Sequence, residues 1–483
     1  MCTLCAAAQP LIFACPLAGL PDFAATAATQ TEGLDAAGGT STVYTLQSGD
    51  SFSGAISLPG DDDWVRLTLS TGEHEVSLRG DTLADPYLRV YDGGGNLIGE
   101  SDDLGPADPD SGILLTITGT VTLYLSARAA DGVSTGSYTI DINGGDQQPP
   151  ADPQPSGDLD ALAAYLIDGY WTDTAQDSHS FALAPGAAIS VNLAALTAEE
   201  QKLARWALEA WTAVADLRFS ETTGPAQITF TNDQPGAYTT YTTLGGATTS
   251  ATVNITSNWL TLHGATIDSY AFQTYVHEIG HALGIGHLGN YDGNGIYGED
   301  ETFGNDSWQV SVMSYFSQTQ NTLIDADFAR PTGPMIADVL AMQTLYGAPG
   351  AGTLTAGDTV FGVGHTLGGS WLGLVFDGMN GSGTPASWSN DPAAFTIVDA
   401  GGHDRIDFSN DQQAQVVDLR PEGVSDVYGL TGNLLIARGT VIEDYTAGAG
   451  DDRVTGNAAD NRLAGGAGDD RLSGGDGDDW LAG

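Results

Sequence analysis

The run from His277 to His287 holds three histidines and one glutamate at a spacing suited to metal-assisted hydrolysis. His277 and His281 are four residues apart, so on a helix both imidazoles project from one face and can bind one ion. Gly284 lets the chain leave the helix, and His287 can then return as a third ligand. Three protein ligands leave one coordination position for water, which is typical of a catalytic zinc ion.

Glu278 directly follows the first histidine, so its carboxylate points beside the metal and can reach the bound water. Zinc lowers the pKa of that water from about 15.7 towards about 7, and the carboxylate can take its proton as hydroxide attacks a polarised carbonyl. The expected reaction is hydrolysis of an amide. Histidines without ligand spacing are expected on the surface or in loops, and these are His74, His179, His263, His365 and His403.

The elements that must position this site follow from hydrophobic periodicity. We expect the first two histidines on a helix from about 270 to 283. A second helix follows Thr197, which forms a capping box with Glu200, and its Trp206 and Trp211 are expected in the core. The other predicted elements are strands at 227–231 and 251–255 and a helix at 335–346. The strand at 251–255 is expected to be the edge strand beside which a peptide substrate lies.

The glycine and third histidine of the zinc run stand at the positions of the metzincins, and Met313 fits the Met-turn of that clan. Together with the run 338–347 and the C-terminal repeats, the chain from about residue 158 onward resembles the serralysins, which are bacterial calcium-dependent metzincins. The resemblance implies that Tyr315 ligates zinc and swings to stabilise the tetrahedral intermediate. The alternative is a packed aromatic ring near the site.

The end of the chain repeats glycine and aspartate with a nine-residue period, and Val454, Leu463, Leu472 and Leu481 fill the apolar position of successive copies. This pattern predicts a parallel β-roll that binds calcium through turn carbonyls and aspartates. The resemblance to the serralysins implies calcium ligands at Gly357, Thr359, Asp399, Gly401, Gly402, Asp404, Glu443, Gly448, Gly450, Asp452, Asn457, Ala459, Asn461, Gly466, Gly468, Asp470, Gly475, Gly477 and Asp479.

Residues 41–144 alternate between apolar and polar types in short runs separated by turn residues, which predicts an antiparallel β-sandwich. The block resembles the bacterial pre-peptidase C-terminal domain at Asp63-Trp64, at 85–88 and at 136–138. A surface or polymer target is one role that we consider for it. The predicted order is a leader (1–40), this N-terminal antiparallel β-sandwich (41–144), a linker (145–157), an α/β metzincin catalytic domain (158–347) and the C-terminal parallel β-roll (348–483).

Composition excludes several partners. The chain has 62 acidic and 14 basic residues, a net charge of −48, which repels nucleic acid and anionic membranes. The acids either form a solvated surface or bind calcium. The only cysteines, Cys2, Cys5 and Cys15, lie near the start, so no disulfide scaffold is expected, and Cys2 and Cys5 are either part of an unstructured leader or a redox or metal pair. No stretch of about 18 apolar residues predicts a membrane span.

An ordinary export signal is not expected, because no lysine or arginine occurs before Arg66. The resemblance instead implies one-step bacterial export to the extracellular space, directed by a C-terminal signal. The sequence stops at Gly483, immediately after the last repeat, so either it is truncated or export works differently. The sequence thus predicts a secreted zinc endopeptidase with one catalytic zinc ion, several structural calcium ions and polypeptide substrates. The alternative is a non-catalytic calcium-binding adhesin or matrix protein with a vestigial zinc run, against which the retained Glu278 argues.

Overall fold

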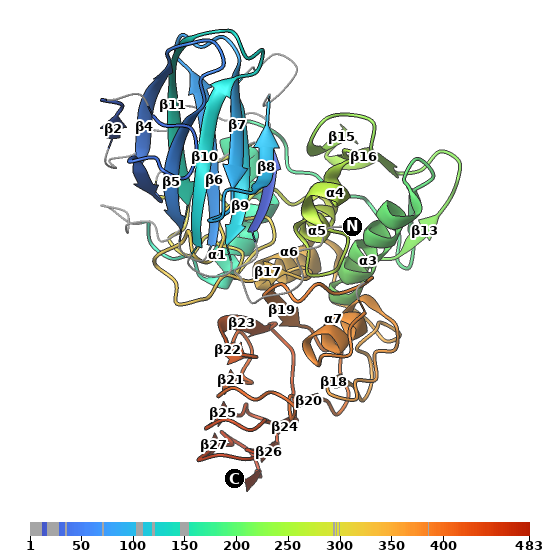
Figure 1. Ribbon diagram of the computed structural model, residues 1–483. Helices are drawn as coiled ribbons and strands as arrows, with labels where there is room; N and C mark the ends of the chain where they lie inside the picture. Colours follow the sequence, from blue (N-terminus) through green and yellow to red (C-terminus); the bar gives the residue numbers. More distant parts are fainter. Residues whose placement is uncertain are drawn as a thin grey trace. The chain divides into compact units, whose positions relative to one another are not determined.

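The computed structural model describes residues 12–16, 29–33, 36–69, 72–102, 110–117, 121–144, 154–292, 295, 297–298, 300–384 and 386–483. The chain forms two compact units, Met1–Pro149 and Pro150–Gly483, each with a hydrophobic core of its own (Figure 1). Cys2 and Cys5 lie outside the described residues. Within the described part, no helix has the length and apolar character needed to cross a membrane.

The first unit is a β-sandwich, as predicted. Its six-stranded sheet has the order β1-β9-β6-β11-β4-β2 and its five-stranded sheet the order β3-β5-β10-β7-β8. Alternation turns Val65, Leu67 and Leu69 of β5 into the core. β1 and β2 fall within the expected leader. The strands are β1 (Ile12–Pro16), β2 (Thr29–Thr31), β3 (Thr45–Gln47), β4 (Ser51–Ile56), β5 (Asp63–Leu69), β6 (Gly72–Gly80), β7 (Pro86–Tyr91), β8 (Leu97–Ser101), β9 (Ser111–Ile117), β10 (Val121–Ala129) and β11 (Gly136–Gly144).

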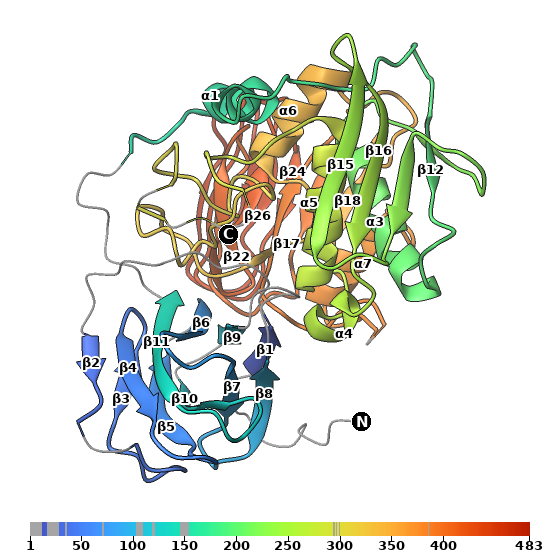
Figure 2. The ribbon, with the colours of Figure 1, turned by 90° about the horizontal axis from the view of Figure 1, so that it is seen from above.

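The second unit begins with a five-stranded sheet of order β13-β12-β14-β16-β15. Its strands are β12 (Ile189–Asn192), β13 (Phe219–Glu221), β14 (Ile228–Thr231), β15 (Ala237–Leu244) and β16 (Ala247–Ile255). The prediction that 251–255 forms the edge strand is wrong, because β15 pairs antiparallel with β16 and takes the edge (Figure 2). Gly245 and Gly246, with φ of +62° and +82°, make the tight turn between the two strands.

Helices cover this sheet and carry the site. They are α1 (Leu159–Ala164), the π-helical segment η1 (Tyr165–Gly169), α2 (Tyr170–Asp173), α3 (Ala198–Val214), α4 (Trp259–His263), α5 (Tyr270–Leu283), α6 (Ile336–Tyr346) and α7 (Trp371–Met379). The predicted capping box starts α3, and Trp211 is fully buried with its Nε1 donating to the carbonyl of Val276 in α5 at 3.0 Å. Trp206 is only half-buried. The buried tryptophan joins α3 to the helix that carries the histidines.

The predicted β-roll forms the end of the second unit, where short strands stack in two sheets (Figure 1). Val454 pairs with Leu472 and Leu463 with Leu481, so copies nine residues apart alternate between the sheets. One sheet has the order β17-β19-β23-β22-β21-β25-β27 and the other β18-β20-β24-β26-β28. The strands are β17 (Arg330–Pro331), β18 (Val360–Gly362), β19 (Ala393–Ile397), β20 (Arg405–Asp407), β21 (Val416–Asp418), β22 (Val424–Val427), β23 (Leu430–Ile436), β24 (Asp444–Thr446), β25 (Arg453–Thr455), β26 (Arg462–Ala464), β27 (Arg471–Ser473) and β28 (Trp480–Ala482).

Candidate metal centre

Helix α5 and the turn after it present the three histidines to one point. The helix starts at Ser269, whose Oγ accepts a hydrogen bond from the amide of Phe272, and ends at Gly284 in a left-handed conformation with φ of +112°. A side chain at Gly284 would place its Cβ 2.0 Å from the carbonyl oxygen of His179. Glycine at this position therefore allows both the exit from the helix and the close contact that directs His287 back.

The Nε2 atoms of the three histidines lie within hydrogen-bond distance of one another. They are 3.1 Å apart between His277 and His281, 3.0 Å between His281 and His287, and 3.3 Å between His277 and His287. Three nitrogens bound to one tetrahedral zinc ion at about 2.0–2.1 Å would be about 3.3 Å apart. The three ring nitrogens therefore fit a single zinc ion.

The second nitrogen of each ring is held by a backbone carbonyl. His277 Nδ1 donates to the carbonyl of Val312 at 2.9 Å, and His281 Nδ1 donates to that of Ile285 at 2.9 Å. His287 Nδ1 donates to the carbonyl of Tyr291 at 2.7 Å. These bonds require hydrogen on Nδ1, so each neutral ring offers the Nε2 lone pair to the metal. Burial lowers the pKa of His277 to about 4, and burial with the neighbouring imidazoles holds those of His281 and His287 well below the usual range.

Glu278 is buried beside the three histidines and contacts the edge strand β15. Thr239 Oγ1 lies 2.8 Å from the Oε2 atom and 2.8 Å from the backbone oxygen of Glu278. Burial raises the pKa of the Glu278 carboxyl to about 8 in the protein alone, and a bound dication would favour the ionised form. A carboxylate held here is suited to accept a proton from metal-bound water.

Met313 lies under helix α5, where the Met-turn was expected. It is fully buried, and its Sδ would come within 2.8 Å of a Cβ at Gly280. The turn is held by Asp338 of α6, which accepts hydrogen bonds from Ser311 Oγ at 2.6 Å and from the amide of Val312 at 2.7 Å. Because the carbonyl of Val312 binds His277, Asp338 supports a ligand indirectly. No role was predicted for Asp338 from the sequence, although its place three residues into α6 was a capping signal.

Tyr291 holds His287 through its backbone and is itself anchored by Asp306, and neither contact was predicted from the sequence. Its carbonyl accepts the Nδ1 hydrogen of His287, and its hydroxyl donates to the buried carboxylate of Asp306 at 2.9 Å. Tyr315 lies next to this pair, with its ring centroid 4.5 Å from that of His287 and 4.7 Å from that of Tyr291. The structure thus brings Tyr315 beside one of the three clustered histidines.

His179 lies in a loop, as expected, but its side chain is buried, whereas His74 is buried in β6, so the prediction of a surface or loop position is wrong for His74. The ring of His179 stacks on that of Tyr241 in β15, with the centroids 3.6 Å apart, and its Nδ1 contacts Thr248 Oγ1 at 2.9 Å. Burial lowers the pKa of His179 to about 4. Isolated histidines carry no periodic signal that would have revealed this packing.

In the last copies of the β-roll, a turn that holds predicted calcium residues stacks on the turn 18 residues earlier in the sequence. A Cβ at Gly466 would lie 2.1 Å from the carbonyl oxygen of Gly448, and a Cβ at Gly468 would lie 2.1 Å from that of Gly450. On the other side of the roll, Gly475 and Gly477 stack in the same way on Asn457 and Ala459. Earlier in the chain, two turns that hold predicted calcium residues lie against each other, and Asp399 and Glu443 lie beside this contact. The residues that form it are Gly357, Thr359, Gly401, Gly402 and Asp404.

Several carboxylates in these turns have one oxygen bonded to the backbone and a second oxygen with no hydrogen-bond partner. Asp404 accepts from the amide of Thr359 at 2.7 Å, Asp452 from that of Gln415 at 2.7 Å, and Asp470 from that of Asp452 at 3.0 Å. Their Oδ2 atoms are buried and unpartnered in the described structure. Burial and the neighbouring Asp404 raise the pKa of Asp399 to about 7. Buried oxygens without donors, next to turn carbonyls, fit calcium ions.

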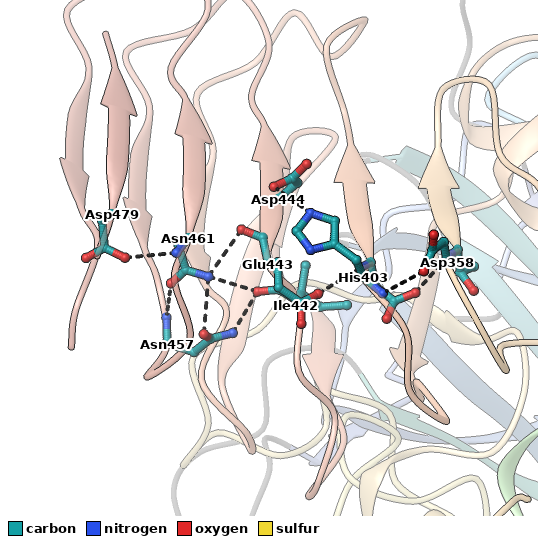
Figure 3. A network of polar contacts seen from close by, with 10 residues as sticks. Asp358, His403, Ile442, Glu443, Asp444, Asn457, Asn461 and Asp479 are labelled. Atoms are coloured by element: carbon teal, nitrogen blue, oxygen red, sulfur yellow. Dashed lines mark hydrogen bonds and ion pairs between the residues drawn. The ribbon is translucent and has the colours of Figure 1, made fainter. Parts of the chain in front are cut away.

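The contact between Asn457, Asn461 and the turn before them is built differently (Figure 3). Asn461 Nδ2 donates to the carbonyls of Ile442 at 3.0 Å and Glu443 at 3.2 Å, and Asn457 Nδ2 donates to that of Ile442 at 2.7 Å. Side-chain amides thus satisfy the carbonyls that face this turn. On the opposite side, Asn461 donates its backbone amide to Asp479 at 2.9 Å.

Comparison with known proteins relates the second unit to a group of peptidases. Residues 381–480 match the C-terminal family of the M10 serralysin peptidases. Over 276 residues the chain is 36% identical to Metallopeptidase AprA of Pseudomonas marginalis, covering 54% of each chain. Over 266 residues it is 39% identical to Serralysin C of Dickeya chrysanthemi, covering 52% of each chain. The chain therefore spans about half the length of the curated relatives it matches.

A solved structure is similar to part of the chain at a low score. The pre-peptidase C-terminal domain of a collagenase from Bacillus anthracis aligns with a TM-score of 0.18 and 10% identity, covering 21% of this chain and 93% of that domain. A likeness at this score defines neither fold nor function, and the β-sandwich of the first unit is established by its own strand order.

Proposed function

We propose that the metal centre of this serralysin relative is the catalytic zinc site of an endopeptidase. The observation that carries the proposal is the convergence of three Nε2 atoms, within 3.3 Å of one another, beside the buried carboxylate of Glu278. His277, His281 and His287 would hold the zinc ion, which when bound supplies a Lewis acid and an acidified water.

The residues of this chain carry the proton and charge steps. Glu278 takes a proton from the attacking water and passes it to the leaving nitrogen. Tyr315, beside His287, is placed to donate a hydrogen bond to the oxyanion of the tetrahedral intermediate. Met313 and Asp338 position these groups from below without touching the substrate.

The substrate is an extended polypeptide that pairs with the edge strand β15. This strand ends the sheet order in the described structure, and it lies against α5 through the contact between Thr239 and Glu278. Adding one strand to an open edge satisfies the peptide backbone and brings a scissile bond over the neighbouring helix. The sequence alone pointed to 251–255, whereas β15 is the strand that offers a free edge.

Calcium ions bound in the β-roll stabilise the second unit and suit a protein that works outside the cell. Extracellular calcium modules bind with dissociation constants of about 10⁻⁴ to 10⁻³ M, so such a roll is saturated only where calcium is abundant. The net charge of −48 adds mutual repulsion among acids when calcium is absent. We therefore propose that the protein is exported and folds its roll in the extracellular space.

Hydrolysis of casein by the full chain, in calcium, tests the proposal. Activity should disappear when zinc is chelated and return when zinc is restored, and Glu278→Ala should be inactive while it still binds zinc. Asn258→Asp, an exposed change at the start of α4, serves as the control. A wild-type chain that binds zinc and cleaves nothing would favour the rival hypothesis of a calcium-binding adhesin or matrix protein.

The first unit is proposed to direct the peptidase to a neutral polysaccharide surface. Three of the four arginines among residues 1–149, Arg66, Arg89 and Arg128, lie on the outer face of β5, β10 and β7. Cross-strand pairing places Tyr124 beside Arg66 and Tyr87 beside Arg128 on that face. Because the unit has its own core, residues 1–149 can be tested alone on insoluble cellulose and chitin. Failure to bind either polymer would contradict this role.

A further inference from the structure

The edge strand β15 contacts the general base through one side chain. Thr239 is half-buried and places its Oγ1 2.8 Å from Glu278 Oε2 and 2.8 Å from the Glu278 carbonyl oxygen. Both oxygens are acceptors when Glu278 is ionised, so the threonine hydroxyl is the donor, and its single hydrogen is shared between the two. Thr239 therefore joins the main chain of α5, the carboxylate that it carries and the strand offered to substrate.

We propose that Thr239 is a positioning residue that selects which oxygen of Glu278 acts as the base. The inference rests on the proposed peptidase function. With Oε2 engaged by the hydroxyl, Oε1 is the oxygen turned to the attacking water. Threonine suits this task because its branched Cβ restricts the side chain to few rotamers, which keeps the hydroxyl fixed on the strand.

The hydrolysis step that this contact serves leaves Thr239 chemically unchanged. The water oxygen forms a bond to the carbonyl carbon, and one water proton moves to Glu278 Oε1. The C–N bond then breaks, and the same proton moves from Oε1 to the leaving nitrogen. Throughout, the threonine O–H donates to Oε2, which stays an acceptor whether Glu278 is ionised or protonated on Oε1.

The placement of Thr239 on the edge strand also links substrate binding to the base. The hydroxyl contacts Glu278 in the chain without substrate, so a peptide that pairs with β15 meets a base that is already positioned. The effect of losing the hydroxyl is therefore expected in turnover and not in substrate affinity.

The experiment compares Thr239→Val, Thr239→Ala and Thr239→Ser in the full chain loaded with zinc and calcium. A hydrogen bond to a charged group corresponds to a change of about 10- to 100-fold, so Val and Ala should lower kcat by that factor while KM stays within about twofold. Ser restores the hydroxyl and should keep kcat within about threefold of wild type. Thr229→Val, half-buried in β14 and two strands away from β15, is the matched control.

Zinc content and the melting temperature are measured on every variant. Loss of zinc in Thr239→Val and Thr239→Ala would overturn the inference, because the residue would then support the metal site as a whole. Unchanged kcat in both variants, or a rise in KM alone, would overturn it as well. An inactive wild type with zinc bound would instead refute the proposed peptidase function, so the two failures are distinguishable.

Discussion

Replacing Asn461 by aspartate should weaken the β-roll at the turn contact where the side-chain amides of Asn457 and Asn461 face the carbonyls of the preceding turn. In the described structure, Asn461 Nδ2 donates to the carbonyls of Ile442 and Glu443 and to Asn457 Oδ1 (Figure 3). Aspartate has nearly the same shape but no hydrogen to donate when ionised. The change therefore removes the donors and turns a carboxylate towards the same oxygens.

The size of the effect follows from which groups lose their partner. Ile442 keeps the amide of Asn457 at 2.7 Å, and the carbonyl of Glu443 keeps the backbone amide of Arg462 at 2.8 Å, so neither acceptor is left without a donor. The hydrogen bonds lost are worth about 0.5–1.5 kcal/mol each, and a buried carboxylate turned towards the same carbonyl oxygens adds about 1–3 kcal/mol. We expect the local free energy of opening to fall by about 2–4 kcal/mol.

Hydrogen exchange of the backbone amides in β24 and β26 measures this directly. In chelator, Asn461→Asp should exchange at least about 30-fold faster than wild type in these strands, since about 1.4 kcal/mol corresponds to a factor of ten. Calcium should restore part of the protection, because the new carboxylate and the carbonyls form a set of oxygen ligands. Asn258→Asp, exposed at the start of α4 and without a side-chain capping bond, controls for the added charge. Equal protection of Asn461→Asp and wild type in chelator would refute the reasoning.

Four further outcomes follow from the contacts of the site. Asp338→Ala removes the acceptor of the Ser311 and Val312 hydrogen bonds and should weaken zinc binding by about 10- to 100-fold, as measured by competition with a zinc chelator. An unaltered zinc affinity would show that the Met-turn keeps its conformation without Asp338. Gly284→Ala, at φ +112° and with its Cβ 2.0 Å from the carbonyl oxygen of His179, should lower the melting temperature and the zinc content, and a fully loaded, equally stable variant would speak against the close contact. Zinc should stay bound as the pH falls below 6.5, because burial lowers the pKa of His277 to about 4, and burial with the neighbouring imidazoles holds those of His281 and His287 well below the usual range; half-release at pH 6.5 in a zinc assay after dialysis would contradict this. For the same reason the neutral buried His179, with its pKa near 4 against about 6.5 unfolded, contributes stability above pH 6.5 that is lost as the pH falls towards 4, and His179→Gln should flatten that part of the stability curve measured by urea unfolding.

Local patterns in the sequence were enough for several of the elements and for the grouping of the three histidines. The spacing of His277, His281 and His287 follows from the pitch of one helix and one turn, and the structure joins their Nε2 atoms as that spacing requires. The nine-residue period predicts the roll because each copy repeats the same turn and the same apolar position. The capping box at Thr197 started the helix where it was expected. In each case the residues that matter are close in sequence, and their geometry is set by the backbone period.

The neighbours of these groups were decided by the tertiary structure alone. Thr239 is 39 residues from Glu278, and Asp338 is 26 residues from Val312, so no local period relates either pair. The threonine-rich strand β15 shows little apolar alternation, because an edge strand with a half-exposed face has few side chains to bury, and the edge was therefore assigned to 251–255. The burial of His179 was not predicted because a single residue has no pattern, and it depends on packing against Trp171 and Tyr241, the latter far away in the sequence. Sequence thus determines which side chains can bind the metal, whereas long-range packing decides which groups hold them in place.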